Sequence, residues 1–181
     1  MSTSKELVSK IESREATVAV CGLGYVGLPL IGAFYNQGFK TYGFDIDQRK
    51  IDDLEAGNSY IEHIDFDMLK KAIDEERFIP TTDFGRIGEP DIILIAVPTP
   101  LTHTREPDLT AVRATCTQIA KGLRKGQLVI LESTTYPGTT EEVCQPILEE
   151  SGLKTGEDYF LGYSPEREDP GNPKFETKTI P

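Results

Sequence analysis

The sequence predicts an α/β fold: a single domain in which helices doubly wind a mainly parallel sheet. Three observations support this fold class. Short apolar runs alternate along the chain with segments of helical periodicity. The run at 91–97 is apolar without alternation, as expected of a strand that helices cover on both faces. A Gly-x-Gly-x-x-Gly motif at 22–27 lies between a predicted strand and a predicted helix.

The predicted elements follow one another in a nearly regular order. A short helix to about residue 12 forms an N-terminal extension, residues 1–15, before the first strand. Strands are expected at 16–21, 40–45, 77–81, 91–97, 127–131 and 158–163. Helices are expected at 25–37, 48–56, 66–75, 107–123 and 139–150. Gly38 should end the first of these helices, and Thr139-Thr140-Glu141-Glu142 should start the last as a capping box.

The composition is that of an ordinary globular protein and argues against some classes of partner. The chain has 181 residues, enough for one domain with a real core. A net charge of −11 argues against nucleic acid and anionic membrane surfaces as partners. No apolar run approaches the roughly 20 residues of a membrane-spanning helix, so no membrane association is expected. Cys21, Cys116 and Cys144 lack metal-ligand spacing, which predicts no metal site, reduced thiols and a cytoplasmic location.

The glycine motif favours a dinucleotide site. Gly22 can make the tight turn after the strand, Gly24 leaves room for a pyrophosphate, and Gly27 lets the helix pack closely on its strand. The N–H groups and dipole at the start of that helix suit phosphate. The predicted fold is therefore Rossmann-like. The alternative for this stretch is a glycine-rich turn without a ligand.

Asp45 closes the second predicted strand and favours NAD over NADP. It lies 18 residues beyond Gly27, close to the offset at which a carboxylate accepts hydrogen bonds from the adenosine ribose. A carboxylate there also repels a 2′-phosphate. Arg49 and Lys50 are cations that could hold such a phosphate, but they fall in the first turn of the next helix. The structural alternative for Asp45 is an N-cap of that helix.

Polar loops follow three further predicted strands, at 98–100, 132–138 and 164–172. The carboxyl ends of parallel strands meet at one edge of a sheet, where ligands of this fold bind. Each loop alone has the composition of an ordinary turn. Together, at successive strand ends, they favour a shared binding site.

At these loops the sequence resembles a known family. The resemblance rests on Gly-Leu-Gly-Tyr-Val-Gly-Leu-Pro at 22–29, Ala-Val-Pro-Thr-Pro at 96–100, Glu-Ser-Thr-Thr-Tyr-Pro-Gly-Thr-Thr at 132–140 and Tyr-Ser-Pro-Glu-Arg at 163–167. Together these motifs look like the N-terminal NAD-binding domain of the UDP-sugar 6-dehydrogenases. The amino-acid sequence at 105–109 and at 164–172 is similar to that of the UDP-N-acetylglucosamine and UDP-N-acetylmannosamine branch of this family. The resemblance covers nearly all of the chain from Thr17 onward.

The resemblance implies oxidation of the C6 alcohol of a UDP-sugar to a carboxylate, with two NAD used in succession. It implies catalytic roles for Glu166 and Thr134, and contacts of Arg167 and Glu168 with the UDP-sugar substrate. The cofactor-binding residues it implies, together with those from the glycine motif, are Gly22, Gly24, Tyr25, Val26, Gly27, Asp45, Lys50, Val97, Pro98, Thr99, Ser133 and Thr134.

The family's nucleophilic cysteine and catalytic lysine belong to a second half. We therefore expect the 181 residues to form an NAD-binding domain without the central helix and the C-terminal UDP-sugar-binding domain, and to be inactive alone. The full-length enzyme is expected to be a homodimer. The rival interpretations are a UDP-glucose 6-dehydrogenase, a hydroxyacid or sugar-phosphate dehydrogenase, and a non-catalytic NAD-binding sensor domain.

Overall fold

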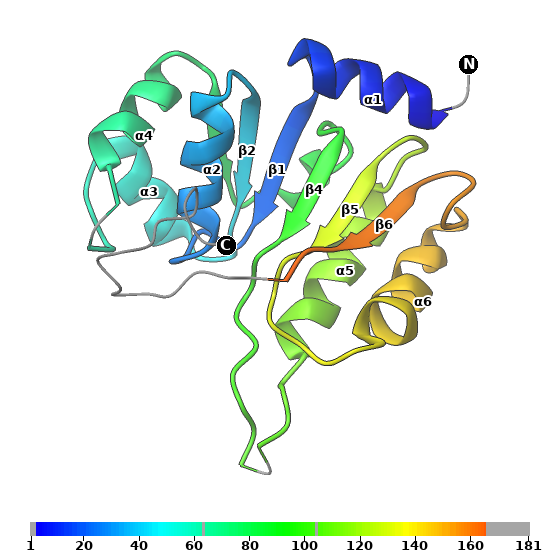
Figure 1. Cartoon of the computed structure of the whole chain (residues 1–181). Coiled ribbons are helices and arrows are strands. Elements are labelled where there is room, and N and C mark those ends of the chain that lie inside the picture. The colour runs from blue at the N-terminus through cyan, green and yellow to red at the C-terminus, as the bar shows by residue number, and fades with distance from the viewer. Residues whose placement is uncertain (1–2, 63, 104, 166–181) are drawn as a thin grey trace.

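The protein contains one six-stranded sheet in which every pairing is parallel (Figure 1). The structure is a computed structural model that describes residues 3–62, 64–103 and 105–165. The strand order is β3-β2-β1-β4-β5-β6. The strands are β1 Thr17–Cys21, β2 Lys40–Phe44, β3 Phe78–Thr81, β4 Ile92–Ile95, β5 Leu128–Leu131 and β6 Phe160–Tyr163. The predicted fold class is confirmed, and the observed strands lie within the predicted ranges.

Besides the strands, the described residues form six α-helices, two 3-10 helices and one π-helix. They are α1 Thr3–Ser13, α2 Gly27–Asn36, α3 Gln48–Ala56, α4 Phe66–Asp74, η1 Phe84–Arg86, α5 Thr110–Gly122, η2 Thr140–Cys144, α6 Gln145–Leu148 and η3 Glu149–Ser151. The helix predicted at 48–56 is observed with the same bounds, and Gly38 follows the end of α2 with a positive φ, as expected. None of these helices is long and apolar enough to cross a membrane.

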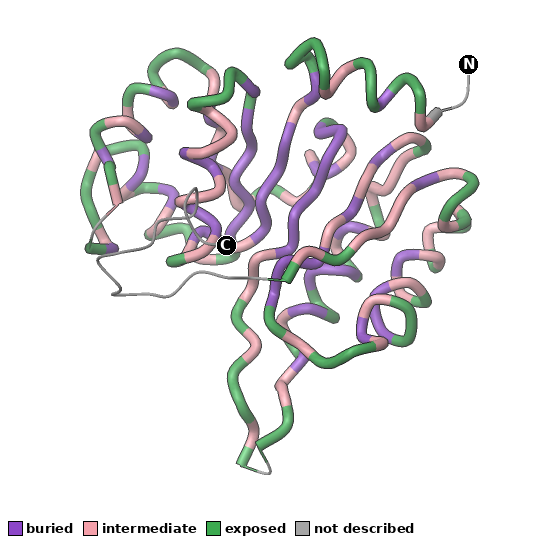
Figure 2. The backbone as a smooth tube through the Cα atoms, in the orientation of Figure 1, coloured by how far each residue is buried: buried purple, intermediate pink, exposed green. Residues whose placement is uncertain are grey.

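Two hydrophobic cores lie on opposite faces of the sheet. Successive residues of a strand point to opposite faces, so Val18 and Val20 join one core while Ala19 and Cys21 join the other. The helices α2, α3 and α4 cover the first face, and α5 and α6 cover the second (Figure 1). Figure 2 shows β1 and β4 buried along their length, whereas β6 at the sheet edge is partly exposed. The run at 91–97 is therefore apolar without alternation because helices cover β4 on both faces of the sheet, as predicted.

The last predicted helix lies where it was expected, but its capping box and its regular α-helical type are wrong. Thr139 makes no capping hydrogen bond, because its backbone is already helical and its hydroxyl donates to the Tyr136 carbonyl at 2.9 Å. A π-helix, η2, then precedes the short α6. Pro146 explains the irregularity, because it has no N–H to continue an ordinary helical ladder through this segment.

A buried carboxylate fixes the N-terminal helix to the sheet. Asp91, directly before β4, accepts hydrogen bonds from Lys10 of α1 at 3.0 Å, from Arg124 at 2.9 Å and from the Thr17 N–H at 3.1 Å. Burial alone would raise the pKa of the Asp91 carboxyl, but these three hydrogen bonds together hold it below its ordinary value. The cluster joins α1, β1, β4 and the turn before β5.

Candidate functional site

The glycine loop between β1 and α2 has the geometry that the motif predicts. Gly22 has a φ of +100°, and a Cβ there would lie 2.5 Å from the Ala96 carbonyl oxygen. A Cβ on Gly27 would lie 1.8 Å from the Gly22 carbonyl oxygen, so α2 packs directly on the turn. A Cβ on Gly24 would meet no atom within 4 Å. Two glycines are therefore required by the fold, and the third keeps a space open.

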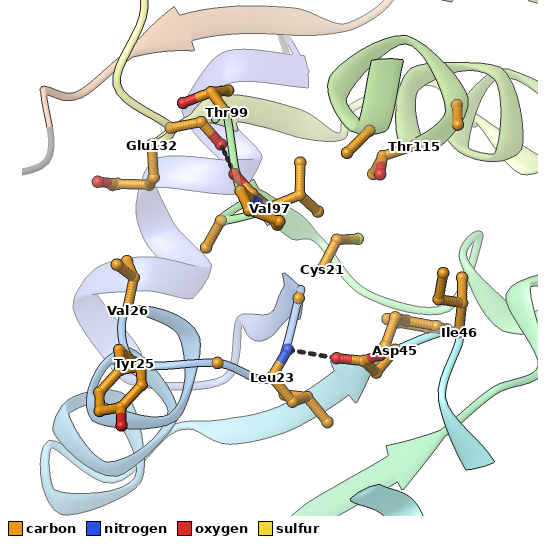
Figure 3. A pocket seen from close by; sticks show the side chains of 18 of the residues that line it. Cys21, Leu23, Tyr25, Val26, Asp45, Ile46, Val97, Thr99, Thr115 and Glu132 are labelled. Carbon is orange, nitrogen blue, oxygen red and sulfur yellow. Dashed lines mark hydrogen bonds between the residues drawn. The ribbon is translucent and has the colours of Figure 1, made fainter. Parts of the chain in front are cut away.

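Asp45 holds the glycine loop and does not cap a helix. Its Oδ2 accepts from the Leu23 N–H at 2.8 Å and from Lys50 Nζ at 2.7 Å, and its Oδ1 accepts from the Asp47 N–H at 3.0 Å. The cap of α3 is Asp47, which accepts from the Arg49 N–H. The N-cap alternative for Asp45 is thus wrong. Figure 3 shows the bond from Leu23 to Asp45 at the edge of the pocket.

The loops after β4 and β5 are joined by side-chain hydrogen bonds. Thr99 Oγ1 donates to the Thr134 carbonyl at 2.6 Å, and Ser133 Oγ donates to the Val97 carbonyl at 2.7 Å. Between β4 and α5 the chain runs out past the carboxyl ends of the strands, where Leu101 and Pro107 pair as an antiparallel bridge (Figure 1). The two polar loops therefore form one rim.

A cavity of about 640 Å³ lies at this edge of the sheet, within the usual size range of small-molecule sites. It lies where the strand order changes direction, with β2 on one side of β1 and β4 on the other. The predicted cofactor residues that line it are Gly22, Gly24, Tyr25, Val26, Asp45, Lys50, Val97, Pro98, Thr99, Ser133 and Thr134. Gly27 lies beneath this surface, at the contact between α2 and the turn.

Sequence reasoning missed half of the cavity wall. One side is a face of α5 formed by Ala111, Ala114, Thr115 and Gln118. Their spacing is that of one helix face, so the helical period contained the signal. Ile46, next to Asp45, is 89% exposed and also lines the cavity. Glu132 at the end of β5 also lines the cavity, and it belongs to a loop that the sequence singled out without giving this residue a role.

The predicted residues Glu166, Arg167 and Glu168 lie outside the described residues, so their assigned roles stay predictions.

The three cysteines are free thiols in the core on the face of the sheet that α5 and α6 cover. Burial, with a smaller contribution from Asp45, raises the pKa of the Cys21 thiol to about 12. A hydrogen bond to Cys144, followed by burial, raises the pKa of Cys116. Cys144 itself is fully buried.

Comparison with known proteins identifies the family. A model of the UDP-glucose/GDP-mannose dehydrogenase family, NAD binding domain, matches residues 16–181. The chain belongs to this family. NAD is accordingly its cofactor, and α1 lies entirely before the matched region.

Two curated relatives and one solved structure illustrate the similarity. The UDP-N-acetyl-D-glucosamine 6-dehydrogenase of Pseudomonas aeruginosa is 42% identical over 92% of this chain and 39% of its own length. The UDP-N-acetyl-D-mannosamine dehydrogenase of Escherichia coli is 39% identical over 86% of this chain and 38% of its own length. The NDP-N-acetyl-D-galactosaminuronic acid dehydrogenase of Methanosarcina mazei superposes with a TM-score of 0.81 at 34% identity, over 93% of this chain and 38% of that one. The chain thus spans well under half the length of these relatives.

Proposed function

We propose that this chain is the NAD-binding half of a dehydrogenase that oxidises the C6 alcohol of a UDP-N-acetylhexosamine to a carboxylate with two NAD. The observation that carries the proposal is the cavity formed by the glycine loop, Asp45 and the two joined loops, in a domain of this family. The names of the two curated relatives support the choice of an N-acetylhexosamine.

The residues present fit NAD. Gly24 lines the cavity with open space where a side chain would be, which suits a pyrophosphate. Asp45 stands at the tip of β2 with its oxygens directed by the Leu23 and Asp47 N–H groups, which suits ribose hydroxyls. The bound nicotinamide would supply the hydride acceptor. Tyr25 and Val26 would lie along the pyrophosphate, Lys50 near the adenosine, and the residues that would line the nicotinamide side are Val97, Pro98, Thr99, Ser133 and Thr134.

The remaining chemistry would come from other residues. By resemblance, Glu166 would act on the water that releases the product, Thr134 would assist near the reacting carbon, and Arg167 and Glu168 would contact the UDP-sugar. A nucleophilic cysteine and a lysine would come from a second half, and the whole enzyme would be a homodimer. The free buried thiols support the reducing cytoplasm as its compartment.

The chain should bind NAD more tightly than NADP, by roughly tenfold or more. The Asp45 carboxylate can accept from ribose hydroxyls and repels a 2′-phosphate, and Lys50 is already paired with it at 2.7 Å. Calorimetry with both cofactors measures the preference. The Asp45→Asn variant, which keeps an acceptor for the Leu23 N–H, should reduce the difference in affinity between NAD and NADP. Equal or tighter NADP binding by the unmodified chain would contradict the role of Asp45.

The 181-residue chain alone should show no dehydrogenase turnover on any UDP-sugar. A four-electron oxidation needs a nucleophile to hold the intermediate aldehyde, and an accessible thiolate is the usual means. Cys21, Cys116 and Cys144 are each 0–1% exposed, and burial disfavours the Cys21 thiolate. NADH absorbance with UDP-N-acetylglucosamine, UDP-N-acetylmannosamine and UDP-glucose tests this expectation.

The same assay on the full-length protein separates the rival functions. Preferred oxidation of UDP-glucose would favour the UDP-glucose 6-dehydrogenase, and no oxidation of any UDP-sugar would favour a hydroxyacid dehydrogenase or a sensor domain. NADH production by the 181-residue chain, lost on mutating one of its cysteines, would place the catalytic centre in this half and overturn the proposal.

A further inference from the structure

Glu132 is an acidic residue in the cavity wall that the proposed function leaves without a role. It follows β5 directly, and its N–H donates to the Ile95 carbonyl at 2.9 Å, which fixes its backbone beside the end of β4. The residue is 9% exposed and lines the cavity together with Ser133 and Thr134. A carboxylate in such a confined site interacts more strongly with a nearby charge than one on the surface does.

Two acidic residues thus lie at opposite ends of the cavity. Asp45 follows β2 and Glu132 follows β5, with β1 and β4 between them. At about 4.8 Å per strand, the two strands are roughly 14 Å apart. Figure 3 shows Asp45 and Glu132 on opposite sides of the pocket, with Cys21 and Val97 between.

Given this order of strands, one half of a bound dinucleotide would lie near Asp45 and the other near Glu132. A dinucleotide carries one ribose on each side of its pyrophosphate. If the pyrophosphate lies at Gly24 and the adenosine ribose at Asp45, the other half must extend over β4 and β5. The nicotinamide half then lies against Val97, Thr99 and the loop that begins at Glu132.

We propose that the Glu132 carboxylate faces the nicotinamide half and favours the oxidised cofactor. The oxidised nicotinamide ring carries a positive charge that the reduced ring lacks, so a carboxylate beside it stabilises NAD⁺ relative to NADH. The inference rests on the proposed orientation of NAD in this cavity. For a dehydrogenase, such a preference promotes release of the reduced product.

The Glu132→Gln variant tests the inference, because it removes the charge and keeps the size and an acceptor oxygen. Affinities for NAD⁺, NADH and ADP are measured by calorimetry on the 181-residue chain. We expect the dissociation constant for NAD⁺ to rise roughly five- to tenfold, as for the loss of one partly screened charge contact, with a smaller rise for NADH. ADP has no nicotinamide half, so its affinity should be unchanged.

Two further variants serve as controls. Glu141→Gln removes the same charge at an exposed position of η2 and should change none of the three affinities. Asp45→Asn should weaken ADP and NAD⁺ together, because ADP contains the adenosine ribose. The melting temperature of each variant reports whether the fold is intact.

The outcomes separate the inference from the function on which it rests. A selective loss of NAD⁺ affinity by Glu132→Gln supports the inference. Equal losses for NAD⁺ and NADH, no loss at all, or a loss for ADP with a lower melting temperature overturn it, the last by showing a structural role. If the unmodified chain binds neither NAD⁺ nor ADP, the proposed function itself fails.

Discussion

Replacing Gly27 by alanine should unfold the domain or destabilise it by about 3 kcal/mol or more. The new Cβ would lie 1.8 Å from the Gly22 carbonyl oxygen and 3.2 Å from Val20 Cγ1. The first contact is with backbone, so relief requires α2 to move away from the turn and from β1. Such a cost is a large part of the 5–15 kcal/mol that stabilises a typical domain. Urea unfolding followed by circular dichroism measures it.

Gly24 supplies a matched control three residues away on the same loop. A Cβ there meets nothing within 4 Å, and its φ is not in the left-handed region. Gly24→Ala should therefore leave stability within about 1 kcal/mol of the unmodified chain. Gly24→Val should also fold but should lose NAD binding, because the larger side chain fills the space proposed for the pyrophosphate. A Gly27→Ala domain as stable as the Gly24→Ala domain would contradict the packing role of Gly27.

Replacing Asp91 by asparagine should cost about 2–3 kcal/mol of stability at pH 7. The change leaves the cations of Lys10 and Arg124 without their carboxylate, and it weakens the acceptor for the Thr17 N–H. The estimate lies below the roughly 3–5 kcal/mol that breaking a fully buried ion pair costs, because the side chains of Lys10 and Arg124 are 39% and 40% exposed. Urea unfolding at pH 7 measures the difference.

The difference should disappear in acid. The folded-state pKa of Asp91 is depressed, so its stabilising contribution is fully present above the unfolded pKa of about 3.9. The contribution is lost as the pH falls from that value through the lower folded-state pKa. The difference between the unmodified and variant domains should therefore begin to shrink below about pH 4 and vanish only once the pH lies below the folded-state pKa of Asp91. Asp74→Asn, which breaks an exposed ion pair with Lys70, should cost less than about 1 kcal/mol. A difference at Asp91 that persists unchanged in acid would show that charge is not its cause.

The parts of the fold that sequence could predict are those set by local chemistry. The strands and most helices follow from apolar periodicity, and the turn at Gly22 follows from a positive φ that glycine adopts readily. Asp45 stands at the tip of β2, as the sequence predicts, but its bond to Leu23 joins the segments that follow two different strands. The π-helix η2 was not predicted, because the capping-box pattern at 139–142 indicates an ordinary α-helix and Pro146 alone does not indicate a π-helix.

The parts that could not be predicted depend on contacts between distant residues. Lys10 and Asp91 are 81 positions apart, and nothing near either residue indicates the other. The wall of the cavity on α5 has the composition of an ordinary helix face, and it becomes part of a site only because α5 packs beside the ends of β4 and β5. The sequence located the loops of the site, whereas tertiary packing determined its walls.

The position of β1 in the sheet also determines when the domain can complete itself during synthesis. β1 emerges first from the ribosome, but one of its two partners is β4, in the register Val18 with Ile92. Until Ile95 has emerged, one edge of β1, four of whose five residues are buried, has no neighbour, and Lys10 has no Asp91 to bind. An unpaired apolar edge is a template for association with other chains. The nascent chain therefore carries such an edge on β1 until β4 arrives, and a pause in translation before that point would prolong the exposure of the edge.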